Sequence, residues 1–175
     1  MLTSEMEAVF LKSLADDPRD LASRNAYHDW LEERGRQDDA DSLFQPLKPK
    51  SKTSGYPTWD VSVLLGQTCV RADGVKDGES LVMVLANGQT VSLHHDQDCC
   101  EHVYLEDIVG DLNDLVGSPL TMSEAAVNPP GAENKGGESY TWTFYKFATV
   151  KGYVTVRFYG TSNGYYSESV DMHVT

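Results

Sequence analysis

The chain has few cysteines and few basic residues. Only three cysteines occur in its 175 residues, at Cys69, Cys99 and Cys100. A low, odd number favours reduced thiols over a framework of disulfide bonds. Lysine and arginine total 14 against 27 aspartate and glutamate residues, which gives a net charge of −13 and a surface that repels phosphate backbones. These shortages argue against a small disulfide-stabilised protein and against binding of extended nucleic acid.

A long apolar segment is also absent. No run approaches the roughly 20 residues that a membrane-spanning helix requires. Residues 1–10 include acidic but no basic side chains, unlike the basic start of a secretory signal. We therefore expect a cytoplasmic protein that does not engage a membrane. Hydrophobic content of 40% with charged content of 23% predicts a globular fold.

Residues 1–46 carry the pattern of a small helical module. Ser4 and Glu7 have the spacing of a capping box at the start of a first helix. A second helix is expected to begin near Asp20 and to stop at Gly35, and a short third helix follows it.

The second predicted helix contains the segment Tyr27-His28-Asp29-Trp30-Leu31-Glu32-Glu33-Arg34-Gly35. Together with the preceding Phe10-Leu11, this segment resembles the repeat-companion domain of planctomycete proteins, over residues of about 4–45. The resemblance implies an N-terminal accessory module and implies no chemistry. The helical spacing of Tyr27 and Trp30 indicates core side chains rather than rings that stack on a ligand.

Residues 47–58 are predicted to be a linker, because Pro49, Gly55 and Pro57 interrupt a segment without apolar periodicity. Residues 59–175 are predicted to form the second domain. The expected fold class is α+β, with the small helical module followed by an antiparallel sheet domain that has one helix packed on it.

The first expected hairpin of the sheet domain turns at Asn87-Gly88. A two-residue turn there pairs Val84 with Val91 and Val82 with Leu93, which places these four side chains on one apolar face. An earlier strand is expected from Val61 to Val70.

A helix is expected between the two hairpins of this domain. Leu105, Ile108, Leu112 and Leu115 recur at helical spacing, and Gly117 follows as a stop.

Two further segments point to a family. They are His95-x-Gln97-Asp98-Cys99-Cys100-Glu101 and Ser162-Asn163-Gly164-Tyr165-Tyr166-Ser167. With the residues between them, they resemble an uncharacterised domain of bacterial and phage proteins over residues of about 60–175. The resemblance implies an architecture and not a reaction.

The segment from His94 to His102 concentrates groups that could bind a metal or transfer a proton. On an extended strand, one face would carry His94, Asp96, Asp98, Cys100 and His102. Among these, His94, Cys100 and His102 are weak candidates for metal ligands. Adjacent cysteines point to opposite faces of a strand, and no second cluster of cysteine and histidine accompanies them, so we predict no metal and no cofactor. A metal-dependent or cysteine-based hydrolytic enzyme centred on His94–His102 stays open as the alternative function.

The second expected hairpin turns at Lys151-Gly152 and brings Lys146 opposite Arg157, with Tyr145 and Phe158 on the core face. Two cations at one place in an acidic domain need either carboxylate partners or an anionic ligand. Nearby aromatic rings could stack on such a ligand. The predicted binding residues are Trp142, Phe144, Lys146, Arg157, Tyr159, Asn163 and Tyr165. The sequence thus predicts a non-enzymatic binding or interaction module for a small anionic aromatic molecule or a protein partner, in an oligomeric state that the sequence does not specify.

Overall fold

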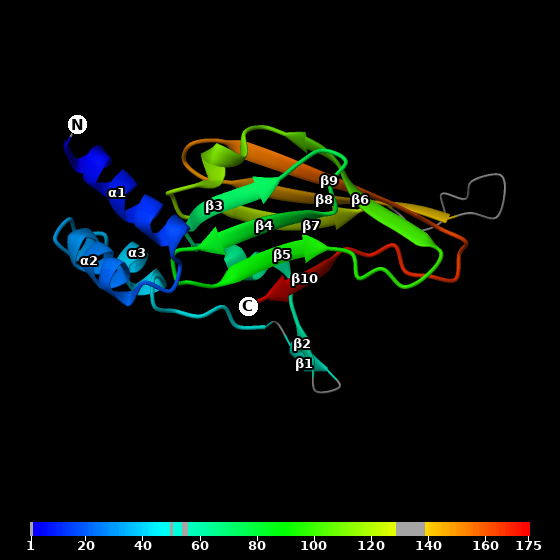
Figure 1. Ribbon diagram of the computed structural model, residues 1–175, viewed down its shortest axis with the longest axis horizontal. Helices are drawn as coiled ribbons and strands as arrows, with labels where there is room; N and C mark the ends of the chain where they lie inside the picture. Colours follow the sequence, from blue (N-terminus) through cyan, green and yellow to red (C-terminus); the bar gives the residue numbers. More distant parts are fainter. Residues whose placement is uncertain (1, 50, 54–55, 129–138) are drawn as a thin grey trace.

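The computed structural model describes residues 2–49, 51–53, 56–128 and 139–175. Three helices are followed by two four-stranded antiparallel sheets, so the predicted α+β class is confirmed. The helices are α1 (Leu2–Asp16), α2 (Leu21–Glu32) and α3 (Gln37–Ser42). They lie together at one end of the sheets (Figure 1). None of the described helices is long and apolar enough to cross a membrane.

The helices begin and end largely where the sequence indicates. Asp20 caps α2, because its carboxylate accepts a hydrogen bond from the Ala22 amide at 3.0 Å. Tyr27 and Trp30 are buried between the helices, as predicted. The start of α1 was predicted wrongly: the helix begins at Leu2, so Ser4 lies inside it and not at its N-cap.

The first sheet has the strand order β10-β5-β4-β3. Its strands are β3 (Cys69–Gly74), β4 (Ser80–Leu85), β5 (Thr90–His94) and β10 (Asp171–Val174). The earlier strand that we predicted from Val61 begins only at Cys69, because residues 61–64 form the short 3-10 helix η1 (Val61–Leu64).

The second sheet has the order β6-β9-β8-β7. Its strands are β6 (Glu101–Val109), β7 (Met122–Val127), β8 (Ser139–Ala148) and β9 (Tyr153–Ser162). A separate two-stranded sheet of β1 (Ser51–Thr53) and β2 (Tyr56–Thr58) lies within the predicted linker. It projects from the body of the molecule (Figure 1).

The two large sheets share one core. Alternate side chains of each sheet point inward and are almost fully buried, which is the pattern of two packed sheets. The inward residues of the strands include Leu81, Met83, Leu85, Val91, Leu93, Leu105, Tyr145, Phe147, Val154, Val156 and Phe158.

The hairpin between β4 and β5 differs by one residue from the predicted register. Val84 lies opposite Thr90 and Met83 opposite Val91, rather than Val84 opposite Val91. The turn spans three residues, with Leu85 and Gln89 hydrogen bonded around it and Gly88 at φ +87°. A three-residue loop with glycine in the left-handed conformation is the alternative to a two-residue turn at Asn-Gly. The shift exchanges the faces of β4, so Leu81 and Met83 face the core and Val84 faces outward.

The register of the hairpin between β8 and β9 differs by two residues from the predicted register. Arg157 lies opposite Phe144, and Lys146 lies opposite Thr155, so the predicted direct pairing of Lys146 with Arg157 is wrong. The loop spans residues 149–152 instead of two residues. A register shift of two residues leaves each side chain on the same face of the sheet, because side chains alternate between the faces with a period of two. The predicted core face is therefore correct.

The predicted helix at Leu105 is also wrong, since these residues form β6 and the short 3-10 helix η2 (Leu112–Leu115). A bulge between Leu105 and Asp107 inserts one extra residue into β6. The apolar positions Leu105 and Ile108 thus fall three residues apart within a strand, which imitates helical spacing.

The helices pack on the outer side of the first sheet. Val70, Val84 and Ala86 of β3, β4 and the turn after β4 belong to the same buried cluster as the helical core. Arg24 of α2 donates from Nε to the Ala86 carbonyl at 3.1 Å. The division into residues 1–46, 47–58 and 59–175 stays a prediction, and these contacts show where the helical part meets the sheets.

Candidate functional site

The outer side of the β6-β9-β8-β7 sheet carries most of the predicted binding residues. We call this surface the outer face. Its cross-strand rows are fixed by the register: Tyr104, Tyr159 and Trp142 form one row, and Asp107, Arg157 and Phe144 form another. The outer face therefore has an aromatic half and a charged half.

The aromatic half is a connected cluster of rings. The Trp142 ring centroid lies 5.2 Å from that of Tyr159 and 5.1 Å from that of Tyr140, and the Tyr104 centroid lies 6.1 Å from that of Tyr159. His102 extends the cluster, 5.0 Å from Tyr104. Separations of 4.5–7 Å are those of attractive aromatic pairs. The four larger rings are half-buried, so each keeps an accessible part.

The charged half fixes the aromatic half in place through Glu106. Its Oε2 accepts from Arg157 Nε at 2.7 Å and from Trp142 Nε1 at 3.1 Å. Asp107 adds a second carboxylate, 3.5 Å from the Arg157 guanidinium. Arg157 is therefore neutralised by acidic partners from β6, which is one of the two arrangements that the sequence left open.

Lys146 is in a different situation. It lies opposite Glu124 on β7, and among the described residues we find no hydrogen bond or ion pair of its ammonium group. The predicted cation pair is thus one paired arginine and one lysine for which the described residues provide no partner.

The protonation of Tyr159 is set by its neighbours. Partial burial, the nearby Tyr104 and the carboxylate of Glu106 raise the pKa of Tyr159. Its phenol stays neutral around pH 7 and acts as a hydrogen-bond donor or acceptor rather than as an anion.

Asn163 and Tyr165 lie in the loop after β9, outside the ring cluster. The Asn163 side chain accepts from the Tyr165 amide at 3.1 Å, which closes the turn. The Tyr165 side chain is 90% exposed and makes no ring contact within the described residues. Asn163 lines a small hollow together with Cys100 and His102, so it borders the aromatic half.

The segment from His94 to His102 is a loop and not a strand, because β5 ends at His94 and β6 begins at Glu101. The expectation that its alternate residues share one face is therefore wrong. The buried Glu101 carboxylate organises the loop. It accepts from the amides of Asp98 and Cys99 and from His95 Nε2 at 3.3 Å. Burial by itself would raise the pKa of Glu101, but these hydrogen bonds outweigh it and lower the pKa to about 2.

The two cysteines at the tip of this loop are exposed, with their sulfur atoms 2.9 Å apart. The hydrogen bond that the Cys100 thiol donates to Cys99 raises the pKa of Cys100, as do the nearby acidic groups. Both ring nitrogens of His95 face acceptors, Glu101 and the Ser169 carbonyl. His95 is thus held as a structural donor, and the geometry does not resemble a thiolate activated by a histidine base.

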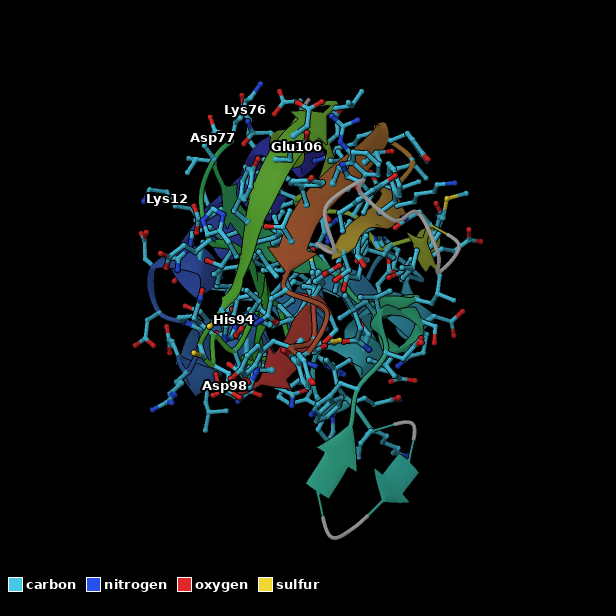
Figure 2. All side chains as sticks on the ribbon, turned by 90° about the vertical axis from the view of Figure 1, so that its right-hand side faces the viewer. Lys12, Lys76, Asp77, His94, Asp98 and Glu106 are labelled. Carbon is cyan, nitrogen blue, oxygen red and sulfur yellow. The ribbon has the colours of Figure 1, made fainter. Side chains whose placement is uncertain are left out.

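Of the weak metal candidates, only His94 joins a cluster of potential ligands among the described residues. That cluster is His94, Asp96 and His173. His102 packs on Tyr104 instead. Figure 2 shows His94 and Asp98 well below Glu106, so the loop and the charged half of the outer face are separate regions.

Sequence reasoning missed Tyr104, Tyr140, Glu106 and His173. The period-two alternation of His102, Tyr104 and Glu106 was a usable signal for strand β6, but the apparent helical spacing after Leu105 concealed it. His173 gave no signal, because its partner Asp96 is 77 positions away.

Comparison with protein families identifies the sheet domain. Residues 62–172 match the profile of a domain of unknown function, DUF7448, so the chain belongs to this family. No curated protein and no solved structure matches the chain.

Proposed function

We propose that this member of the family is a cytoplasmic, non-enzymatic interaction module whose outer face docks a positively charged segment of a protein partner. The observation that carries the proposal is the accessible ring cluster of Tyr104, Tyr140, Trp142 and Tyr159 on a rigid sheet. Tyrosine, tryptophan and arginine are the residues that most often dominate the energy of protein interfaces.

Charge favours a basic partner. Residues 54–175 contain 6 basic and 16 acidic side chains. Lysine and arginine side chains lie well over the faces of tryptophan and tyrosine rings. An acidic domain also accelerates encounter with a positive partner and repels a negative one.

The pairing of Arg157 weakens the case for a small anionic ligand. Glu106 and Asp107 already occupy its guanidinium, so an incoming phosphate or carboxylate would have to displace them. On the part of the outer face that the structure describes, Lys146 alone remains for such a ligand. A protein partner needs no such displacement, because the Arg157–Glu106 pair can stay intact and hold Trp142.

Rigidity supports the same assignment. The Trp142 ring is held by Glu106 through its indole nitrogen and by two neighbouring rings. A pre-positioned ring loses little conformational freedom when a partner binds. The N-terminal helices, which resemble an accessory module, pack on the other sheet and leave the outer face uncovered by the described helices.

The test is a titration followed by NMR of the tryptophan indole groups. The chain has three tryptophans, and Trp142→Phe assigns the signal of interest. The probes are a short arginine- and lysine-rich peptide, its glutamate-rich counterpart and AMP. We expect saturable shifts of the Trp142 signal with the basic peptide only, weakened about tenfold or more by Tyr159→Leu.

Tyr165→Leu is the matched control, because Tyr165 is exposed and outside the ring cluster. Equal losses for Tyr159→Leu and Tyr165→Leu would contradict docking on the aromatic half. Shifts with AMP but not with the basic peptide would replace the protein partner by a small anionic ligand.

A further inference from the structure

Two histidines from different strands meet on one aspartate. His94 ends β5, and His173 lies in β10, the neighbouring strand. The register pairs His94 with Asp171 and His173 with Ser92, so the two histidines are diagonal neighbours on the same side of the sheet. Their rings stack with centroids 4.6 Å apart and planes inclined by 25°.

Both imidazoles direct Nε2 at the carboxylate of Asp96. The distances are 3.1 Å from His94 Nε2 to Oδ1 and 3.0 Å from His173 Nε2 to Oδ2. One ligand atom from each of the three residues lies within 4.8 Å of the other two. Two ligand atoms on one tetrahedral Zn²⁺, with bonds of about 2.0–2.2 Å, lie about 3.3–3.6 Å apart. The two nitrogen–oxygen distances are therefore within about half an ångström of those around a cation, and the 4.8 Å limit means that the ligand atoms need to approach one another by about 1.5 Å at most.

The surrounding hydrogen bonds orient the ligands. Ser92 Oγ lies 2.9 Å from His94 Nδ1, so it can accept a hydrogen bond from Nδ1–H and leave Nε2 for coordination. The Asp171 carboxylate accepts from the Asp96 amide at 3.3 Å and thereby holds the loop that carries Asp96. The same loop is fixed at its far end by the Glu101 carboxylate.

We propose that His94, Asp96 and His173 form a binding site for a divalent cation of the zinc class. Two imidazoles and one carboxylate are a donor set that zinc accepts, and three protein ligands leave one coordination position open. Exposed carboxylates alone would favour no particular cation, whereas the two imidazole nitrogens select a borderline metal over Mg²⁺ or Ca²⁺. The site departs from the sequence-based expectation of no metal, because the fold supplies His173 as the third ligand.

The open position adjoins space for a further ligand. Asp96 and His173 line a cavity of about 580 Å³ whose wall also includes Trp59 and Tyr145. His94 borders a second hollow of about 370 Å³. A bound cation would thus remain accessible to water or to a small anionic group, unlike a closed structural zinc site.

A second cluster provides an internal comparison. His28, Asp29 and Glu32 lie close together on α2. That cluster has one imidazole, and its ligands come from one exposed stretch of helix, so we assign it no metal. It serves as a control for nonspecific binding by surface side chains.

The experiment uses the full chain, purified without a histidine tag and treated with a chelator. Isothermal titration with ZnCl₂ measures stoichiometry and affinity, and titration with CoCl₂ is followed by visible absorption. We expect one site per chain for Zn²⁺. His94→Ala and His173→Ala should each lower the affinity about tenfold or more, and Ser92→Ala should lower it less. His28→Ala and His102→Ala should change it by less than about twofold.

Folding of the variants is checked by thermal unfolding without metal. The His94 and His173 side chains are 30% and 45% exposed, so their replacement should leave the unfolding midpoint near that of the unmodified protein. Added Zn²⁺ should then raise the midpoint of the unmodified protein and not that of His173→Ala. Absence of saturable binding, affinities of His94→Ala and His173→Ala that equal that of the unmodified protein, or loss of binding in His28→Ala would overturn the site.

Discussion

Arg24 connects the helical part of the chain to the sheets, and its replacement tests whether the two parts unfold together. Its side chain is 8% exposed, although arginine is rarely buried without partners. Nε donates to the Ala86 carbonyl at 3.1 Å, and a terminal nitrogen donates to the Pro18 carbonyl. Arg24→Met keeps the aliphatic stem and a good helix former but removes the guanidinium.

The expected loss follows from these two bonds. A hydrogen bond with a charged partner contributes about 1.5–3 kcal/mol. The methionine avoids the desolvation of a buried cation, which here lowers the pKa of Arg24 and offsets part of that gain. We therefore expect Arg24→Met to lower the free energy of unfolding by about 2–3 kcal/mol. In a chain of this length, about 1 kcal/mol shifts the melting temperature by about 2–4 °C, so the fall should be roughly 4–12 °C.

The assay is thermal and urea unfolding, followed by helical circular dichroism and by tryptophan fluorescence. Arg19→Met is the matched control, since Arg19 is exposed. Because Val70, Val84 and Ala86 share a buried cluster with the helices, we expect both signals to change in one transition. Loss of the helical signal at a lower temperature, with the sheets unfolding at the unchanged midpoint, would refute this coupling and favour independent modules.

Four further outcomes are expected. Glu101→Gln should make the stability of the fold less sensitive to acid. The pKa of Glu101 is lowered from 4.5 to about 2, so its carboxylate stabilises the fold above about pH 4.5 and loses this effect as the pH falls toward 2. Unfolding midpoints measured across that pH range would show the difference. Cys99→Ser and Cys100→Ser should leave the melting temperature unchanged because both thiols are exposed, whereas the buried Cys69→Ser should cost about 1–3 kcal/mol in urea unfolding. Arg157→Met should cost about 1 kcal/mol, because the pair with Glu106 is partly exposed, and Lys146→Met should cost less than about 0.5 kcal/mol; equal losses would mean that Lys146 has a partner in solution. A fragment of residues 56–175 should remain folded by exchange measurements but melt at a lower temperature than the full chain, since it lacks Leu47 of the sheet core and exposes Val84.

The sequence predicted the features that depend on local chemistry. Asp20 marks the start of the second helix and Gly35 marks its end. Both positions could be predicted because capping and the left-handed backbone conformation depend on the chemistry of single residues. The alternation along β8 and β9 assigned Tyr145, Phe147 and Phe158 to the core, and a register error of two residues did not change that assignment.

The lengths of the hairpin loops could be determined only from the tertiary structure. Asn87-Gly88 is compatible with a two-residue or a three-residue turn, and the difference of one residue decides which side of β4 faces the core. The bulge in β6 had a similar effect, because one inserted residue gave a strand the spacing of a helix.

The candidate sites depended still more on the fold. The aromatic half combines rings from β6, β8 and β9, and the register alone brings Tyr104, Tyr159 and Trp142 into one row. The histidine cluster exists because β10 returns beside β5, which places His173 next to His94 after an interval that no local pattern spans. Composition and residue spacing therefore determined the class of fold and the chemical groups that are available. Strand order and register decided which side chains meet, because contacts between segments far apart in the sequence form only when the strands assemble into sheets.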